Sequence, residues 1–229
     1  AILPELVSEA RDDPDAFAAS LRWALERMAL LVLPVSAAMV ALALPAMRAV
    51  SFGETGAEGA RLLAAALGAL GLGLYPYGAF LLLARACYAR GDSRTPGLVS
   101  VGAATIGAGV MAVGALTTDG PSRVAMLGLG HSAAQFIAAV VLAVILARRT
   151  GARVRPAALG RMILVVAAAG GLAWVASDAL LTPATPTVVE AATVAAISGV
   201  GALLVVAGYR VSRVYTALSP RRAVAGSPA

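Results

Sequence analysis

The sequence has few charged residues, and this scarcity excludes most soluble folds. Only 13% of its 229 residues are charged, whereas 60% are hydrophobic. A soluble domain carries about 25% charged residues, because it must cover a surface that faces water. The composition therefore predicts a protein embedded in a membrane.

Cysteine and histidine are nearly absent, which removes several kinds of chemistry. The single cysteine, Cys87, excludes an intrachain disulfide. The single histidine, His131, has no second histidine or cysteine at ligand spacing, so no metal site is predicted. The sequence shows neither a serine–histidine–acid set nor a phosphate-binding glycine loop after a strand. We therefore expect no enzyme, no catalytic residues and no cofactor.

Lysine is absent, and all 18 basic residues are arginine. With the abundant alanine and glycine, this usage indicates a GC-rich genome such as that of an actinobacterium. The net charge of +6 does not indicate nucleic-acid binding, because the arginines form short dispersed clusters without a basic helix face interleaved with aromatic residues.

Six long apolar runs are present, and each can cross a membrane. A hydrocarbon core of about 30 Å takes about 20 helical residues. The runs lack the alternation of β-strands, and in lipid every backbone polar group needs an internal partner, so we predict helices. The predicted spans are 28–50, 62–84, 97–116, 124–147, 162–181 and 188–209. The expected fold is an all-α integral membrane protein with a six-helix bundle over 28–209.

Prolines and glycines mark several of these runs. Pro34 and Pro45 lie in the first span and Pro76 in the second, where each removes a backbone donor and should kink its helix. Glycines recur along the third span at Gly97, Gly102, Gly107, Gly109 and Gly114. Small residues let membrane helices approach closely, which fits either static packing or the moving helix pair of a carrier.

The segment 1–27 precedes the spans and predicts an amphipathic cytoplasmic helix after the end of an earlier span. Asp12 or Asp13 can cap this helix, with Pro14 in its first turn. Its apolar face is formed by Phe17, Leu21, Ala24, Leu25 and Met28. Arg22 and Glu26 fall on another face. We expect this helix to lie at the membrane surface.

The arginines predict the orientation of the bundle. Six spans place both ends of the chain on one side, and 15 of the 18 arginines fall on that side. The other side holds Arg48, Arg61 and Arg123. Basic residues near span ends are retained in the cytoplasm, so both ends of this segment, including a basic tail over 210–229, are predicted to be cytoplasmic.

Few polar residues occur inside the spans. His131 and Gln135 lie one turn apart in the fourth span and can either line a cavity together or donate hydrogen bonds between helices. Arg48, Asp178 and Glu190 lie near span ends and are interpreted as interfacial anchors. We expect no acidic group at mid-depth of the membrane.

A charged run, "LLLARACYARGDSRTP", separates the second and third spans at 81–96. Its distinctive residues are Arg85, Tyr88, Arg90, Asp92, Arg94, Thr95 and Pro96. Asp92 can bond backbone donors in a tight turn, Gly91 permits unusual backbone angles, and Pro96 can start the next helix. The arginines would face anionic membrane lipids.

This run resembles the loop of the MurJ/MviN lipid II flippases, members of the multidrug/oligosaccharidyl-lipid/polysaccharide exporter superfamily. The upstream run "AILPELVSEARDDPDAFAASLRWALERMALLVLPVSAAMVALALPAMRAVSFG" is similar to the same family. The chain departs from the family at Cys87, where an aromatic residue is usual, and at Met111, near which some relatives have a sodium ligand.

The resemblance implies that the chain is the C-terminal lobe of a two-lobed, fourteen-helix flippase in the cell membrane. Such a protein moves the undecaprenyl-linked peptidoglycan precursor to the outer leaflet by alternating access. The resemblance also implies an apolar groove for the lipid tail in the last two spans, at 162–181 and 188–209. The family's central arginines lie in the N-terminal lobe, which would be a partner of this segment.

Two other functions fit the sequence. One is export of another polysaccharide-lipid or a drug by a member of the same superfamily. The other is a transport-inactive membrane scaffold that recruits cell-wall or division proteins, which the scarcity of mid-membrane charge also fits.

Overall fold

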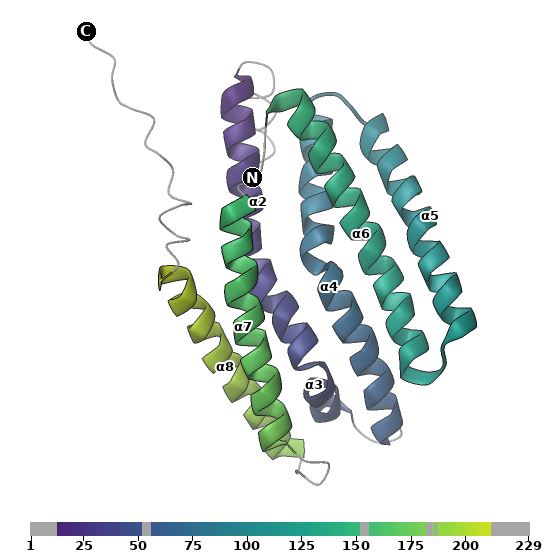
Figure 1. Ribbon diagram of the computed structural model, residues 1–229, viewed down its shortest axis with the longest axis vertical. Helices are drawn as coiled ribbons and strands as arrows, with labels where there is room; N and C mark the ends of the chain where they lie inside the picture. The colour runs from purple at the N-terminus through teal and green to yellow at the C-terminus, as the bar shows by residue number, and fades with distance from the viewer. Residues whose placement is uncertain (1–12, 52–55, 152–155, 182–184, 186, 212–229) are drawn as a thin grey trace.

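The computed structural model describes residues 13–51, 56–151, 156–181, 185 and 187–211. These residues form seven helices, labelled in Figure 1: α2 (Pro14–Ala41), α3 (Ala43–Val50), α4 (Gly56–Ala89), α5 (Arg94–Thr117), α6 (Gly120–Thr150), α7 (Pro156–Leu180) and α8 (Thr187–Val211). Six of them are long and apolar enough to cross a membrane. The all-α membrane fold class is confirmed. The predicted end of an earlier span and the tail beyond residue 211 lie outside the described residues.

Helix α2 covers the described part of the predicted surface helix and much of the predicted first span, without a break at residue 27. The helix begins as expected after Asp13, whose Oδ1 accepts hydrogen bonds from the backbone N–H groups of Asp15 (3.1 Å) and Ala16 (2.9 Å). Phe17 and Leu21 are fully buried in a cluster with residues of α4 and α6. The predicted apolar face therefore packs against other helices of the bundle.

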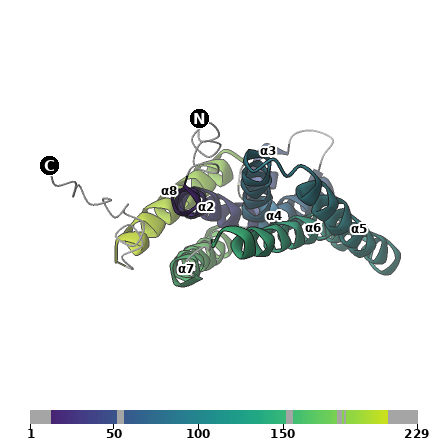
Figure 2. The ribbon, with the colours of Figure 1, turned by 90° about the horizontal axis from the view of Figure 1, so that it is seen from above.

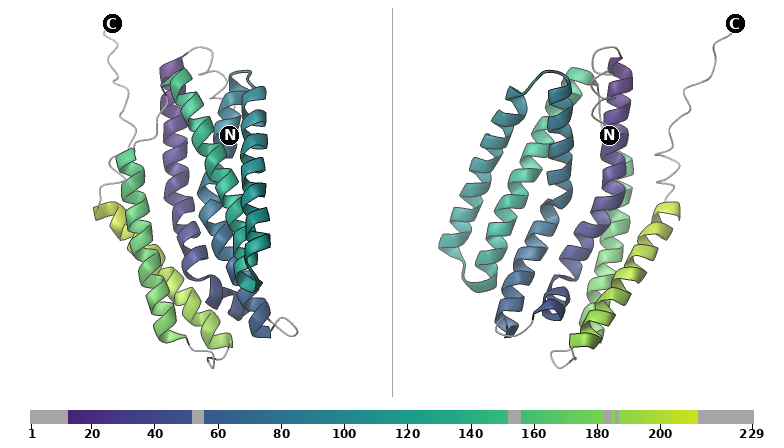
Figure 3. Two further views of the ribbon diagram at one scale, coloured as in Figure 1. Left: turned by 45° about the vertical axis from the view of Figure 1, so that its right-hand side comes forward. Right: turned by 180° about the vertical axis from the view of Figure 1, so that it is seen from behind.

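A break separates α2 from α3 at Leu42. The Leu42 N–H still donates to the Ala38 carbonyl at 2.9 Å, and the Ala46 N–H donates to Leu42. Pro45 has no N–H and cannot donate to the Ala41 carbonyl between these two bonds, so the helix is interrupted there. Pro34 and Pro76 lie within continuous helices, and Figure 3 shows α2 and α4 bending part-way along their length.

The bundle is elongated when seen from above, with α5 at one edge and α8 at the other (Figure 2). Helix α5 packs on α6, α6 packs on α4, and α2 packs on both α4 and α7. Two buried apolar clusters meet at α2: one joins it to α4 and α6, and the other joins it to α7 and α8. Helix α2 therefore connects the two halves of the bundle.

Small residues bring α4, α5 and α6 close together. A Cβ added at Gly107 of α5 would lie 2.6 Å from the backbone oxygen of Gly130 in α6. A Cβ at Gly73 of α4 would lie 2.8 Å from the Cα of Ser132 in α6. These contacts leave no room for a methyl group, so the predicted close approach of small residues is present between these helices.

The helices alternate in direction, which sorts the described arginines. One end of the bundle holds the start of α2, the α4–α5 loop, the end of α6, the start of α7 and the end of α8. We call this the arginine-rich end; its described arginines are Arg22, Arg27, Arg85, Arg90, Arg94, Arg148, Arg149, Arg161 and Arg210. Arg48, Arg61 and Arg123 lie at the opposite end.

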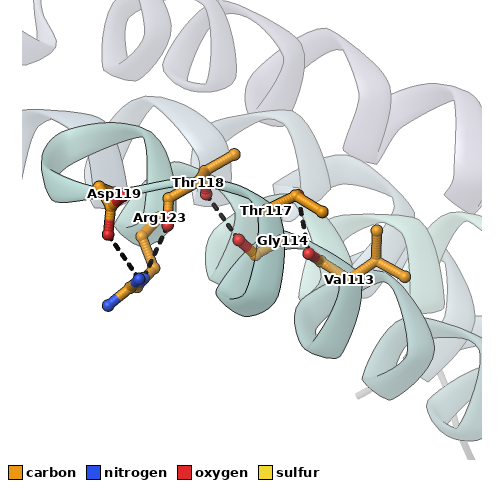
Figure 4. Close-up of polar contacts among 6 residues, drawn as sticks. All are labelled: Val113, Gly114, Thr117, Thr118, Asp119 and Arg123. Carbon is orange, nitrogen blue, oxygen red and sulfur yellow. Dashed lines mark hydrogen bonds and ion pairs between the residues drawn. The ribbon is translucent and has the colours of Figure 1, made fainter.

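At the opposite end of the bundle, Arg123 contacts two residues of the α5–α6 turn (Figure 4). Its guanidinium donates to the Thr118 carbonyl at 2.8 Å and forms a 2.6 Å ion pair with Asp119. The Thr118 hydroxyl donates to the Gly114 carbonyl within α5. Arg123 is thus held by its own turn.

Candidate functional site

The α4–α5 loop carries the charged run that the sequence singled out. Helix α4 ends at Ala89, and Gly91 follows with a φ of 76°, a left-handed conformation that glycine adopts without strain. The Gly91 N–H donates to the Tyr88 carbonyl at 2.9 Å, and the Asp92 N–H donates to the Cys87 carbonyl at 3.0 Å. This pair of bonds satisfies two carbonyls at the end of α4 and reverses the chain.

Asp92 joins the start of α5 to the end of α6. Its Oδ1 accepts from the Thr95 N–H at 2.9 Å, and its Oδ2 accepts from the Thr95 hydroxyl and from Arg149, both at 2.6 Å. The hydrogen bonds from Thr95, followed by that from Arg149, hold the pKa of Asp92 below its usual range. Asp92 therefore stays ionised at neutral pH and keeps its contact with Arg149.

Arg90 extends the same arrangement to α2. Its guanidinium lies 5.7 Å from the centre of the Phe17 ring, close enough for a cation–π interaction. The loop thus contacts α2 through Arg90 and α6 through Asp92. We call Arg90, Asp92, Thr95 and Arg149 the loop clasp, since they hold together the arginine-rich ends of four helices.

The remaining residues of the run do not form the clasp. Arg85, Tyr88 and Arg94 are exposed at the arginine-rich end. Pro96 is fully buried in the first turn of α5, which begins two residues before it. The run therefore divides into buried or paired residues that organise the helix ends and exposed residues that face the surroundings.

Two apolar hollows flank the contact between α2 and α7. The larger has a volume of about 690 Å³ and lies between α2, α4, α6 and α7; it is lined by residues that include Leu33, Tyr75, Phe136, Ile163 and Trp174. The smaller, of about 190 Å³, lies between α2, α7 and α8. Ala37, Val166 and Gly170 line both hollows. Helix α7 therefore has an apolar hollow on each side.

His131 and Gln135 lie on α6 as expected, but neither lines these hollows. His131 is exposed and Gln135 is half-buried. The polar contact between helices is made by their neighbour Ser132, whose hydroxyl donates to the Ala69 carbonyl of α4 at 2.7 Å. Sequence reasoning missed this serine, because its contact with α4 depends on how α6 is rotated against α4.

Two buried carboxyl groups were not anticipated. Glu26, expected on a polar face, is 3% exposed, because α2 lies between α4 and α7. Glu190, expected as an interfacial anchor, is 5% exposed in the first turn of α8. Both positions are polar in sequence, and only the tertiary packing shows that they are covered.

The described residues contain no group of three or more histidine, cysteine, aspartate or glutamate side chains placed to hold a metal ion. Six long apolar helices, packed through small residues and carrying charged ends, define the class of the protein: a multi-pass α-helical membrane protein. A family comparison identifies it further. The model of the family "Lipid II flippase MurJ" matches residues 1–190, and the chain belongs to this family. A comparison with curated proteins finds no match.

Proposed function

We propose that this chain is one lobe of a two-lobed, fourteen-helix flippase that carries lipid II from the cytoplasmic to the outer leaflet by alternating access. The family match over residues 1–190 carries this proposal, because it extends across α2 to α7. The function is transport without covalent chemistry, so the chain needs neither a catalytic residue nor a cofactor of its own.

The arginine distribution supports an orientation with the arginine-rich end in the cytoplasm. In the full sequence 15 arginines fall on that side and three on the other. Of the three, Arg123 is already neutralised by Asp119. Exposed Arg85 and Arg94 at the cytoplasmic end can contact anionic lipid headgroups.

The two hollows beside α7 suit the apolar chain of the substrate. Their walls are aliphatic and aromatic, with Ser36 and Tyr75 among the few polar residues of the larger hollow. A prenyl chain gains little by leaving lipid for such a groove, because the acyl chains around it are equally apolar. The hollows therefore guide the chain by shape and release it readily, while the pyrophosphate is left to the arginines of the other lobe.

The loop clasp supports movement of the lobe as a unit. Alternating access is largely a rigid-body rocking of one repeat or bundle against another. Contacts of the α4–α5 loop with α2 and α6 keep the cytoplasmic ends of these helices together during such a movement. The partner in this movement is the other lobe of the same protein.

The test is to express the full-length protein in cells depleted of their own lipid II flippase. An externally added enzyme that cleaves exposed lipid II then measures the amount of precursor in the outer leaflet. We expect restored external cleavage and growth. Accumulation of lipid II in the inner leaflet, with the protein present in the membrane at normal amounts, would contradict the proposal.

A further inference from the structure

Glu190 lies in the first turn of α8, at the end of the bundle opposite the arginine-rich end. Its side chain is 5% exposed, and its Oε1 is buried without a hydrogen-bond partner. Buried carboxylate oxygens in proteins almost always have a hydrogen-bond donor. The lack of one at Oε1 therefore calls for an explanation.

The charged residues around Glu190 do not neutralise it directly. Helix α8 packs on α7 and α3 and makes a minor contact with α2. Helix α3 contributes Arg48, which acts on Glu190 electrostatically but forms no ion pair with it in the described part of the chain. Helix α7 contributes Asp178, which is exposed, and the charged residues of α2 all lie in its first half.

Arg48 instead lines a hollow of about 300 Å³ between α3, α4 and α7. Ser177 and Asp178 line the same hollow, which makes it more polar than the two hollows beside α7. Arg48 is half-buried there. A guanidinium group thus lies within electrostatic reach of the buried carboxyl group but outside hydrogen-bond contact with it.

Burial and the lack of a donor at Oε1 disfavour an ionised carboxylate at this place. Burying an unpaired charge costs more than the N-terminus of a helix returns by stabilising a nearby anion. A carboxylic acid avoids this cost, since it is neutral and needs fewer partners. The geometry thus favours the protonated form as long as α8 remains packed on α3.

We infer that Glu190 is a proton-binding site at the contact between α3 and α8. The carboxyl group holds a proton while it is buried. When α8 shifts relative to α3, the group releases the proton to water and its carboxylate forms an ion pair with Arg48. Proton occupancy is thereby coupled to the packing of α8. This inference concerns a carboxyl group and a helix contact, and it stands independently of the transported substrate.

Infrared spectroscopy of the full-length protein in lipid bilayers tests the inference. A protonated carboxyl group gives a C=O stretching band that a carboxylate lacks. We expect this band at pH 7 in the natural protein, its loss or clear reduction in Glu190→Gln, and no change in Asp178→Asn, which removes the exposed acid of α7. A band that is absent at pH 7, or that is the same in Glu190→Gln, overturns the inference.

Arg48→Gln tests the role of the guanidinium. Without the cation, the band should persist to a pH about one unit higher, which is a tenfold change in proton affinity. Arg61→Gln, at the same end of the bundle on α4, should leave the titration unchanged. Equal titration of Arg48→Gln and the natural protein refutes the pairing of Glu190 with Arg48. The natural protein provides a further test that needs no variant. If its C=O band disappears over the same pH range in which exposed carboxyl groups ionise, Glu190 is not the proposed proton-binding site.

Discussion

Two regions of the bundle are held together in different ways. The row formed by α4, α6 and α5 packs through glycines that leave no space, as at Gly73 and Gly107. In the α7–α8 pair most glycines face open space: a Cβ at Gly171, Gly199 or Gly201 would meet nothing within 4 Å. Large exposed side chains accompany them, such as Leu164 at 72% and Leu203 at 71% exposure.

This contrast in packing separates a tightly interlocked part of the bundle from a part that borders the apolar hollows. Interlocked backbones in the row have no alternative arrangement at small cost, so the row serves as a frame. The α7–α8 pair has large exposed apolar side chains and borders the apolar hollows, so under the proposed function it would form the wall along which an apolar ligand lies. Helix α2 packs on both and connects them.

The largest effect is expected where the row is tightest. Gly107→Ala places a methyl group against the backbone of Gly130 and should destabilise the protein by about 1–3 kcal/mol, measured by reversible unfolding in bicelles. Gly109→Ala, two residues along the same helix, has open space at its Cβ and should not destabilise. If both variants unfold alike, the glycine contacts do not hold the row together.

A smaller effect is expected from the hydrogen bond between α6 and α4. Ser132→Ala removes the bond to the Ala69 carbonyl and should cost about 0.6 kcal/mol, the average for such bonds in a membrane protein. Ser198→Ala in α8 is the matched control, because its hydroxyl bonds only the Val194 carbonyl of its own helix. If both variants lose the same free energy of unfolding, the hydrogen bond between α6 and α4 does not contribute to stability beyond a bond within one helix.

The smallest effect on global stability is expected at the loop clasp. Asp92→Asn should speed hydrogen exchange at the amides of residues 92–95, while Arg148→Gln beside the clasp should not. Because folding lowers the pKa of Asp92, its contribution is full above about pH 3.9 and is lost as the pH falls through the lower folded value. The natural protein and Asp92→Asn should therefore exchange at the same rate in this loop only in strong acid. A difference between their exchange rates that shrinks as the pH rises from 5 to 8 would contradict the stabilising role of ionised Asp92.

The sequence predicted the parts of this structure that depend on local chemistry. The spans follow from apolar length, the start of α2 from Asp13 and Pro14, and the reversal at Gly91 and Asp92 from turn-forming residues. The burial of Glu26 and Glu190 could not be predicted, because it depends on which helices cover them. For the same reason His131 and Gln135 drew attention, while Ser132 beside them makes the contact between helices.

Under the proposed function, α7 forms the wall of a groove for the apolar chain of lipid II. Photo-cross-linking from α7 of the full-length protein can detect this contact. Ile163 lines the larger hollow, whereas the adjacent Leu164 does not and is 72% exposed. With a photoreactive residue at each position in turn, we expect several-fold more cross-linked lipid II from position 163 than from position 164. Equal yields at the two positions, or a higher yield at 164, would contradict it.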